Sequence, residues 1–361
     1  MSFERRSYQD RAVKLAHDTK SKSLLIISPG GSGKTVMIAR QVKRARRDKK
    51  KVLIISHRYE LNQQIIKTLR EIGEHPSLIQ GKWTSEQQNA VIVASISTLN
   101  KRDWYPKVDL VIIDEAHHAM ATSYKQLIEY YLKAGKKVTG YSATPYRLDG
   151  LGLIEVFDEM YEAVKPSELW GKYIMLPQSW STAPEYLPDL RDLAVQHGDF
   201  NPTELVKRVN KDGLIGGIVA TLRKHLDDLQ AIVFCCSIDH SQKTAKALRK
   251  AGYRCEHVDG DMPQRKRDEI FDKFRSGQIQ ILCNCMLINE GFNVPNCDVV
   301  LMARPTCSLS LYIQMANRCV RINSSGRQPL LIDQACNVTI HEHLPYVDWE
   351  WGLDSTKFTA S

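Results

Sequence analysis

The sequence lacks cysteine throughout its first 234 residues, and it contains no Cys-x-x-Cys pair anywhere. All nine cysteines lie between Cys235 and Cys336. An odd, one-sided set of this kind is typical of a reduced protein and excludes a secreted disulfide scaffold. Their spacing provides no set of four convergent zinc ligands. We therefore predict that most of these thiols are small buried side chains.

Long hydrophobic runs are also missing, and no signal sequence is expected. No apolar run approaches the ~18–20 residues that a membrane helix needs, so no membrane partner is expected. The charges of Met1 to Arg6 have no apolar segment behind them, which predicts the absence of a secretory leader. Lys and Arg outnumber Asp and Glu by 50 to 41, and the net charge of +9 favours an acidic polymer as partner.

What the sequence does contain is a repeated alternation of short apolar runs and amphipathic, helix-length stretches. The runs are rich in Val and Ile and nearly continuous, as expected for parallel strands buried on both faces. This alternation predicts an α/β fold with two doubly wound parallel sheets. The predicted strands are 23–28, 51–56, 90–95, 108–114 and 137–142 in the first half, and 231–237, 255–259, 279–284, 298–303 and 329–333 in the second.

A segment richer in Pro, Gly and polar residues separates the two sets of strands, and it includes Pro177, Pro184 and Pro188. Because 361 residues suggest two to three domains at roughly 150 residues each, we predict two lobes joined by this segment. Trp349 and Trp351 predict that the remaining tail docks on the lobes. The predicted boundaries are 1–165 for the first lobe, 166–212 for a connecting segment with some helix, 213–335 for the second lobe and 336–361 for the tail.

Ser28 to Thr35, with the sequence Ser-Pro-Gly-Gly-Ser-Gly-Lys-Thr, follows the first strand and opens a helical pattern. That is the context which a phosphate-binding P-loop requires, although Ser28 stands where the usual pattern begins with Gly. Lys34 would contact the β- and γ-phosphates of a nucleotide, and the Thr35 hydroxyl would ligate Mg²⁺. Backbone N–H groups at the helix N-terminus would surround the phosphates. The predicted phosphate-binding residues are Pro29, Gly30, Gly31, Ser32, Gly33, Lys34 and Thr35.

Asp114-Glu115-Ala116-His117 follows another apolar strand. A carboxylate at this position is where a second Mg²⁺ contact belongs, so Asp114 would hold the metal. Glu115 would orient and deprotonate the attacking water, and His117 would respond to the state of the γ-phosphate. Each motif alone could be an ordinary turn, but the two together predict a nucleoside triphosphatase.

The order of these and further motifs resembles superfamily 2 helicases of the DEAH-box type, in particular the short bacterial and phage DNA-repair-type (RadD-like) members. The resemblance runs from about Arg6 to at least Asp333. It implies two tandem RecA-like lobes with ATP and nucleic acid in the cleft between them, and ATP and Mg²⁺ as cofactors. It also implies a cytoplasmic protein of a bacterial or phage-infected cell.

The resemblance adds residues to the nucleotide site. Tyr8-Gln9 resembles the Q motif, in which a Gln amide pairs with adenine and selects ATP. Residues 287–295 resemble motif V, and residues 314–321 resemble motif VI, whose two arginines face the γ-phosphate. It thus assigns Tyr8, Gln9, Glu290, Gly291 and Asn293 to nucleotide binding, and Gln314, Arg318 and Arg321 to catalysis beside Lys34, Asp114, Glu115 and His117.

Two positions depart from the family pattern, because Asn293 stands where many members have Asp and Asn317 where they have Gly. Neither change removes a group that the chemistry needs. Other motifs imply contacts with the nucleic-acid backbone, while Ser142-Ala143-Thr144 resembles motif III, which links hydrolysis to strand movement. The residues assigned to nucleic-acid binding are His57, Arg58, Ser95, Thr98, Tyr146, Arg147, Asp259, Asn284 and Thr306.

The predicted function is an ATP-dependent helicase or translocase that couples hydrolysis to lobe closure and stepping. The form of motif Ia at 56–61 and the Tyr146–Gly150 continuation favour DNA, as a single strand or a single/double-strand junction. RNA is the alternative substrate, and a nucleotide-gated nucleic-acid-binding protein with little turnover is the alternative activity. A protein partner could supply strand separation or targeting.

Overall fold

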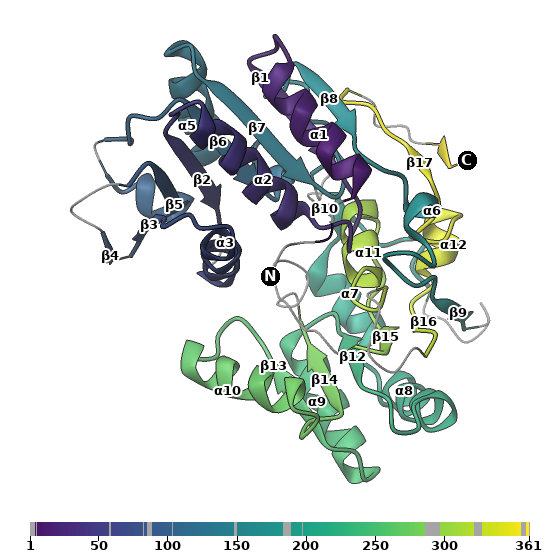
Figure 1. The fold of residues 1–361 in the computed structure, drawn as a ribbon. Helices are drawn as coiled ribbons and strands as arrows, with labels where there is room; N and C mark the ends of the chain where they lie inside the picture. Colours follow the sequence, from purple (N-terminus) through teal and green to yellow (C-terminus); the bar gives the residue numbers. More distant parts are fainter. Residues whose placement is uncertain are drawn as a thin grey trace. The chain divides into compact units, whose positions relative to one another are not determined.

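The computed structural model describes residues 4, 6–57, 59–81, 83–84, 89–102, 104–147, 150–182, 189–196, 198–285, 297–320, 327–354 and 359–360. The chain forms two compact units. Unit 1 contains Met1–Glu168 and Asp348–Ser361, and unit 2 contains Leu169–Val347. The chain therefore leaves unit 1 once and returns to it near the C-terminus (Figure 1).

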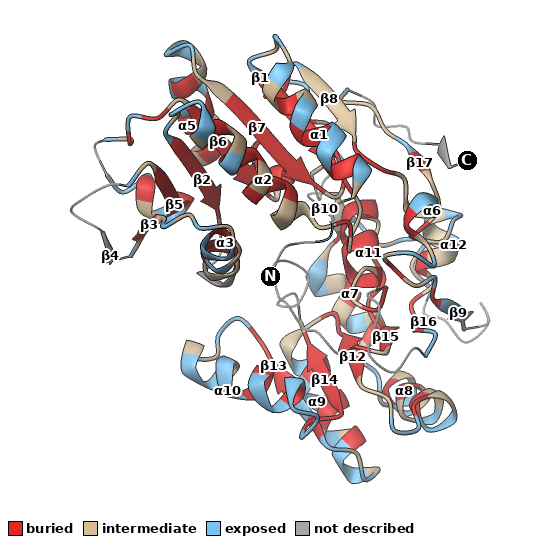
Figure 2. Cartoon of the chain, in the orientation of Figure 1, coloured by how far each residue is buried: buried red, intermediate tan, exposed pale blue. Residues whose placement is uncertain are grey.

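Unit 1 is built on an eight-stranded sheet with the order β4-β3-β5-β2-β6-β7-β1-β8. Its strand pairs are parallel except for the antiparallel pair of β3 and β4. Every residue of β1, β2, β5 and β6 is buried, as the continuous apolar runs predict (Figure 2). The strands are β1 (Ser23–Ile27), β2 (Val52–Ser56), β3 (Ser77–Gln80), β4 (Trp83–Thr84), β5 (Val91–Ser95), β6 (Leu110–Asp114), β7 (Lys137–Ser142) and β8 (Glu159–Glu162).

Helices cover both faces of this sheet, with α1, α2 and α3 on one face and α5 on the other (Figure 1). Alternate strand residues face α5, so that Leu53 and Ile55 of β2 share a core with Leu127 and Tyr131 of that helix. This two-residue period is what a pleated strand between two helical layers requires. The helices are α1 (Ser7–Asp18), α2 (Lys34–Arg47), α3 (Tyr59–Glu71), α4 (Ile96–Leu99), the 3₁₀ helix η1 (Ala116–His118), α5 (Thr122–Lys133) and α6 (Pro166–Leu169).

The C-terminal segment completes the core of unit 1. Trp351 and Leu353 pack against the cluster that includes α5, and the Trp351 ring lies 5.7 Å from that of Tyr146. A Cβ atom on Gly152 would lie 2.0 Å from the carbonyl oxygen of Leu353, so only glycine permits this approach. The strand β17 (Trp349–Glu350) pairs antiparallel with β18 (Thr359–Ala360). Residues 348–354 are thus part of the packing of unit 1.

Three carboxylates gather where this segment begins. Asp348 accepts hydrogen bonds from the backbone N–H and the hydroxyl of Ser167, and it lies near Glu162 at the end of β8. Burial is the main cause that raises the pKa of Glu162 from 4.5 to about 7; the charges of Asp348 and Glu168 add to this rise, and the charge of Lys165 opposes it. Between these two pH values the folded chain holds a proton on Glu162 that the unfolded chain has lost.

Stability should therefore fall as the pH rises through this window, because the folded state binds the extra proton. Glu162→Gln removes the titration. Since the side chain is partly exposed and screened by solvent, we expect the variant to be more stable than the wild type by about 1 kcal/mol at pH ~8, and equal to it at pH ~4. Denaturant unfolding at both pH values measures this, with the exposed Glu71→Gln as control. An equal difference at both pH values would contradict the assignment.

Unit 2 is built on a six-stranded sheet of parallel pairs with the order β13-β14-β12-β15-β16-β9. Its edge strand β9 comes from the segment that the sequence analysis assigns to the connection. The strands are β9 (Gln178–Ser181), β12 (Ala231–Phe234), β13 (Cys255–Val258), β14 (Ile281–Asn284), β15 (Val299–Met302) and β16 (Leu330–Asp333), with a separate antiparallel pair of β10 (Val195–Gln196) and β11 (Asp199–Phe200). The helices are α7 (Pro202–Val209), α8 (Asp212–His225), α9 (Ile238–Lys250), α10 (Gln264–Arg275), α11 (Leu309–Ala316) and α12 (Asn337–His341).

All ten strands predicted from apolar runs are present in the two sheets. Cys235, Cys255 and Cys283 lie in the core of unit 2, and six of the nine free cysteines are buried. This agrees with the expectation of small buried thiols. Burial raises the pKa of the Cys283 thiol well above its usual value.

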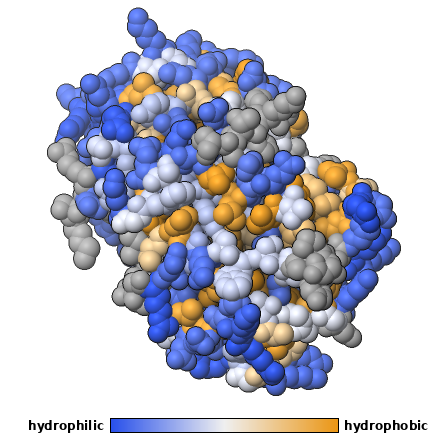
Figure 3. All heavy atoms as spheres, turned by 90° about the vertical axis from the view of Figure 1, so that its right-hand side faces the viewer, coloured by the Kyte–Doolittle hydropathy of each residue, from blue (hydrophilic) through white to orange (hydrophobic). Residues whose placement is uncertain are grey.

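The surface carries only scattered large apolar side chains among the described residues. On the face shown in Figure 3, hydrophilic side chains separate the apolar patches. Within the described part of the chain, no helix is both long and apolar enough to cross a membrane. The exposed large apolar residues are Trp104, Tyr130, Leu151, Ile154, Leu176, Trp180 and Val195.

Candidate nucleotide and nucleic-acid sites

The P-loop connects the end of β1 to the start of α2 at Lys34. Gly31 and Gly33 have φ values of 78° and 83°, which non-glycine residues rarely adopt. At Gly33 space is restricted as well, because a Cβ atom would lie 2.6 Å from the Nε2 atom of Gln9. The first turn of α2 contains no acidic residue. A helix N-terminus of this kind favours an anion.

Hydrogen bonds within unit 1 hold the shape of this loop. The Ser32 hydroxyl donates to the Pro29 carbonyl at 2.6 Å, and Lys34 Nζ donates to the Ser28 carbonyl at 3.2 Å. The Ser28 N–H donates to the Ser142 carbonyl at 2.9 Å, so the loop is tied to motif III at the end of β7. The conformation of the predicted phosphate-binding loop is thus held by contacts within unit 1.

Tyr8 and Gln9 bind the P-loop from helix α1. The Tyr8 hydroxyl donates to the Ser32 carbonyl at 2.6 Å, and Gln9 Nε2 donates to the same oxygen at 2.8 Å. Both side chains are buried. The remaining polar atom of Gln9, Oε1, is buried and accepts no hydrogen bond from the described residues. These contacts place the two residues beside the loop.

Asp114 is the last residue of β6, and Glu115 and His117 follow it; the charge of Lys34 in the P-loop acts on Asp114. Asp114 is buried, and its Oδ1 accepts the N–H of Glu115 at 3.1 Å. Burial and the neighbouring charge of Glu115 raise the pKa of Asp114, whereas the positive charge of Lys34 opposes the rise. Glu115 itself has a φ of 52°, a strained conformation for a non-glycine residue.

These residues have the chemistry of a divalent-cation site. A buried carboxylate whose charge is disfavoured by its surroundings is stabilised by a bound cation. Carboxylate and hydroxyl oxygens are the hard ligands that Mg²⁺ prefers, and Thr35 provides the hydroxyl on the first turn of α2. The residues present therefore fit a magnesium ion held by Asp114 and Thr35.

Three histidines, His117, His118 and His57, pack in sequence next to Glu115. His117 Nδ1 lies 3.5 Å from Glu115 Oε2 and 3.3 Å from the Ser142 hydroxyl. The His117 and His118 rings are 4.2 Å apart, and the His118 and His57 rings are 4.3 Å apart. His57 lies in the segment that resembles motif Ia, so continuous packing joins Glu115 to an expected nucleic-acid contact. No sequence motif marks His118, because its ring contact with His57 joins segments that are distant in the sequence.

The other expected nucleic-acid contacts of unit 1 lie after neighbouring strands. Ser56 and Ser95 are paired in the register of β2 and β5, so both strands end at the same edge. The Thr98 hydroxyl accepts the N–H of Gly81 at 2.9 Å. Tyr146 is buried and accepts the N–H of Gly352, whereas Arg147 is partly exposed. Arg58 lies outside the described residues.

In unit 2, three of the expected contacts lie at or after the ends of strands. Asn284 is fully buried and donates to the Val233 carbonyl at 3.1 Å. The Thr306 hydroxyl donates to Asp199 at 2.9 Å. Asp259 accepts the N–H groups of Asp261 and Met262 and contacts His257 Nε2 at 2.6 Å. Their polar atoms are therefore engaged within unit 2.

Only part of the segment that resembles motif VI lies within the described residues. Gln314 lies on α11 and is buried, and Arg318 follows the helix with partial exposure. The other expected residues of motifs V and VI, which are Glu290, Gly291, Asn293 and Arg321, lie outside the described residues.

One buried ion pair of unit 2 was not foreseen. Arg304 donates to Asp199 Oδ2 at 2.7 Å, while Asp199 Oδ1 accepts from the Thr306 hydroxyl and the Cys307 N–H. Asp199 thereby fixes the chain that follows β15. No local signal marks this residue, because its partners are more than one hundred positions away in the sequence.

Two family models match most of the chain between them. Residues 2–147 match the type III restriction enzyme res subunit, and residues 217–323 match the helicase conserved C-terminal domain. A 51.5 kDa protein of a Lactococcus phage (isolate 7-9) is 31% identical over 327 residues, which cover 91% of this chain and 68% of that protein. This chain is a superfamily 2 helicase. The predicted family and the class of nucleic-acid-dependent ATPases are thus confirmed.

Other relatives of this helicase agree. A Saccharomyces cerevisiae protein named as the ATP-dependent helicase IRC3 is 31% identical over 359 residues, which cover 91% of this chain and 51% of IRC3. The helicase thus spans about half the length of that relative. The structure of S. cerevisiae Dbp5 bound to RNA and ADP BeF3 has a TM-score of 0.62 at 17% identity, and covers 93% of this chain and 85% of Dbp5. This similarity confirms the predicted tandem RecA-like fold.

Proposed function

We propose that this helicase is an ATP-driven motor that moves along DNA. The observation that carries the proposal is the grouping of Lys34, Asp114 and Glu115 beside the P-loop, after strands β1 and β6. Lys34 would provide a cation for the phosphates, Asp114 a metal ligand and Glu115 a base. Phosphoryl transfer to water needs these three groups. A protein that only binds nucleotides would not need the base.

The proposed nucleotide is ATP with Mg²⁺. Phosphates would occupy the glycine-lined loop, and Gln9 Oε1 is a buried acceptor that the adenine amino group could satisfy. Thr35 and Asp114 would hold Mg²⁺, which neutralises phosphate charge when bound. Glu115 would accept the proton of the attacking water, leaving ADP and phosphate as products. We assign Gln314, Arg318 and Arg321 to stabilising the charge of the transferred phosphoryl group.

Two observations favour DNA as the nucleic acid along which the motor moves. The model that matches residues 2–147 is that of a type III restriction enzyme subunit, and the Tyr146-Arg147 continuation of motif III resembles that of DNA-repair-type helicases. RNA is the second candidate, because the similar Dbp5 structure is described as bound to RNA. His57, Arg58 and Arg147 would contact phosphates, since such contacts do not depend on base sequence.

The experiment is a steady-state ATPase assay of the full chain without nucleic acid, with single-stranded DNA and with RNA of the same sequence. We expect turnover to rise more with DNA than with RNA, and the stimulation to weaken as salt increases. Stronger stimulation by RNA would establish the second candidate. An absence of turnover under all three conditions would contradict a motor and favour a nucleotide-gated binding protein.

A further inference from the structure

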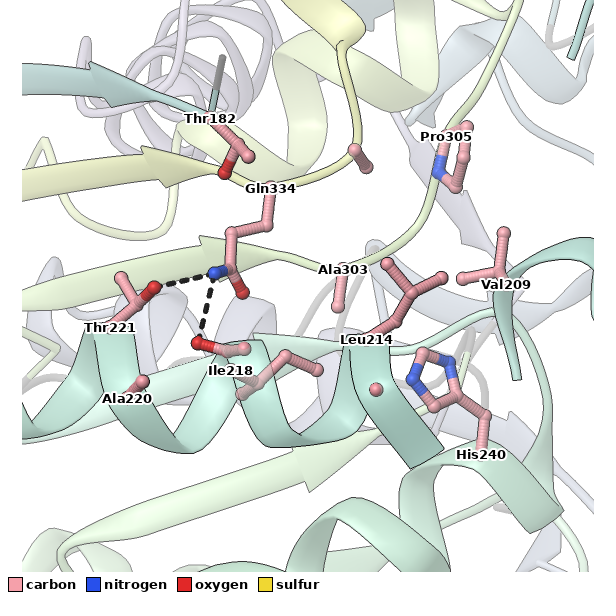
Figure 4. A pocket seen from close by; sticks show the side chains of 13 residues that line it. Thr182, Val209, Leu214, Ile218, Ala220, Thr221, His240, Ala303, Pro305 and Gln334 are labelled. Carbon is pink, nitrogen blue, oxygen red and sulfur yellow. Dashed lines mark hydrogen bonds between the residues drawn. The ribbon is translucent and has the colours of Figure 1, made fainter. Parts of the chain in front are cut away.

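Unit 2 contains a cavity of about 460 Å³ that none of the expected nucleotide or nucleic-acid contacts lines (Figure 4). It lies where β15 and β16 end, beside the first turns of α8 and α9. Ligands of open α/β sheets bind at this carboxyl edge of the strands. Its volume is within the range of small-ligand sites, and exceeds what a single side chain fills.

The wall of the cavity is mainly aliphatic. Val209, Leu214, Ile218, Ala303 and Pro305 face it, and none of the described residues that line it carries a charge at neutral pH. This includes the one ionisable group, since burial lowers the pKa of His240 to about 4. Phosphates and carboxylates therefore find no counter-charge in the cavity.

Two buried polar atoms at this wall lack a hydrogen-bond partner within the described part of the chain. His240 is fully buried, and its Nδ1 accepts the N–H of Cys236 at 3.3 Å, so the ring proton is on Nε2. His240 Nε2 has no hydrogen-bond partner among the described residues. Gln334 donates through Nε2 to the Gly217 carbonyl and the Thr221 hydroxyl, whereas its Oε1 accepts nothing from the described residues.

Beside the Thr182 and Thr221 hydroxyls, the cavity thus presents one buried donor and one buried acceptor that lack a partner among the described residues. Figure 4 shows the His240 ring and the Gln334 amide at the space around Leu214. Buried polar groups are normally hydrogen-bonded, and unsatisfied ones destabilise the fold. Two of them at one cavity indicate a ligand that supplies an acceptor to His240 and a donor to Gln334.

A neutral peptide group has this pair of functions, since its carbonyl accepts and its N–H donates. A nucleobase fits less well, because the lining residues offer no Phe, Tyr or Trp ring for stacking. We propose that this cavity binds an apolar residue of a partner protein, with the side chain between Leu214, Ile218 and Pro305 and the peptide group at His240 and Gln334. Apolar anchors in such pockets dominate many protein interfaces.

The test uses N-acetyl-leucinamide as the probe, with N-acetyl-glycinamide and free leucine as comparisons. The first carries an apolar side chain and neutral amides, the second lacks the side chain, and the third is charged. Methyl-labelled full-length protein would report binding through chemical shifts of Val209, Leu214 and Ile218. We expect saturable shifts with a Kd of ~1–10 mM for N-acetyl-leucinamide, as befits a small ligand, and much weaker effects of the other two.

Two neighbouring glycines of α8 provide matched variants. A Cβ atom on Gly217 or on Gly216 would meet nothing within 4 Å, but Gly217 lines the cavity and Gly216 does not. Gly217→Leu should fill the cavity and reduce probe affinity by at least ~10-fold, whereas Gly216→Leu should leave it unchanged. Both substitutions replace glycine by a better helix former, so neither is expected to destabilise α8.

Three results would overturn the proposal: no saturable shift with the wild-type protein, equal binding of N-acetyl-glycinamide, or equal loss of binding in both variants. The wild-type comparison of probes remains decisive even if one variant folds poorly. The inference does not rest on the proposed motor, because neither glycine belongs to the nucleotide site. ATPase activity of both variants should equal that of the wild type, so failure of the motor proposal would be seen separately.

Discussion

Glu115→Gln is expected to bind ATP with near wild-type affinity and to hydrolyse it ~10²–10⁴-fold more slowly, since positioned general bases contribute about this much. The carboxamide keeps the size of the side chain but cannot take the proton of the attacking water. The backbone N–H that donates to Asp114 is unchanged by the substitution. Nucleotide affinity and phosphate release, measured on the same preparation, separate binding from chemistry.

The neighbouring carboxylate makes this variant more informative. The charge of Glu115 raises the pKa of Asp114, so its removal should make Asp114 easier to ionise and better able to hold a metal. Metal-dependent ATP binding should therefore be kept or strengthened. Glu129→Gln, an exposed change on α5, is the control for the loss of one carboxylate. Wild-type turnover of Glu115→Gln would mean that another group is the base.

Lys34→Ala is expected to lose both ATP affinity, by ~10–100-fold, and turnover. Hydrogen bonds to charged groups contribute ~1.5–3 kcal/mol each, and Lys34 is the cation at the first residue of α2. Its removal would also raise the pKa of Asp114 further, because the Lys34 charge now lowers it. Binding of the nucleotide and of its metal should therefore weaken together. The measurement is an ATP titration by calorimetry, followed by turnover at saturating ATP.

Lys43→Ala is the matched control, because Lys43 lies exposed on the same helix. It removes the same charge without touching the P-loop, and should leave ATP affinity and turnover unchanged. If Lys34→Ala and Lys43→Ala bind ATP equally well, the loop after β1 is not the phosphate site. The assignment of the nucleotide to unit 1 would then fail.

Most of the sheets could be predicted from the sequence because their strands are apolar on both faces. β1, β2 and β6 have no polar alternation that could be mistaken for a helix. The residues proposed for hydrolysis could also be selected from the sequence, since the P-loop and Asp114-Glu115 are short contiguous motifs at the ends of such strands. Signals of this kind are local and depend on a single strand and turn.

The features that the sequence did not reveal depend on distant contacts. β9 has the sequence Gln-Ser-Trp-Ser and is exposed along its length, so no hydrophobic pattern marks it as a strand. The sequence around Asp199 does not distinguish it from a surface carboxylate, because its partners Arg304 and Thr306 are distant in the chain. The return of the chain to unit 1 depends on Gly152 and Trp351, which are about two hundred residues apart.

That return determines which pieces of the helicase can be separated. Unit 2 is an insertion within unit 1, because both of its ends continue into unit 1 at Glu168 and Asp348. A single backbone cut inside unit 2 leaves two fragments that each retain part of unit 1, and the packing of Trp351 and Leu353 can hold them together. A fragment ending at Glu168 would expose the surface that these side chains cover. Isolated unit 1 is therefore best produced by joining residues 1–168 to 348–361 through a short linker.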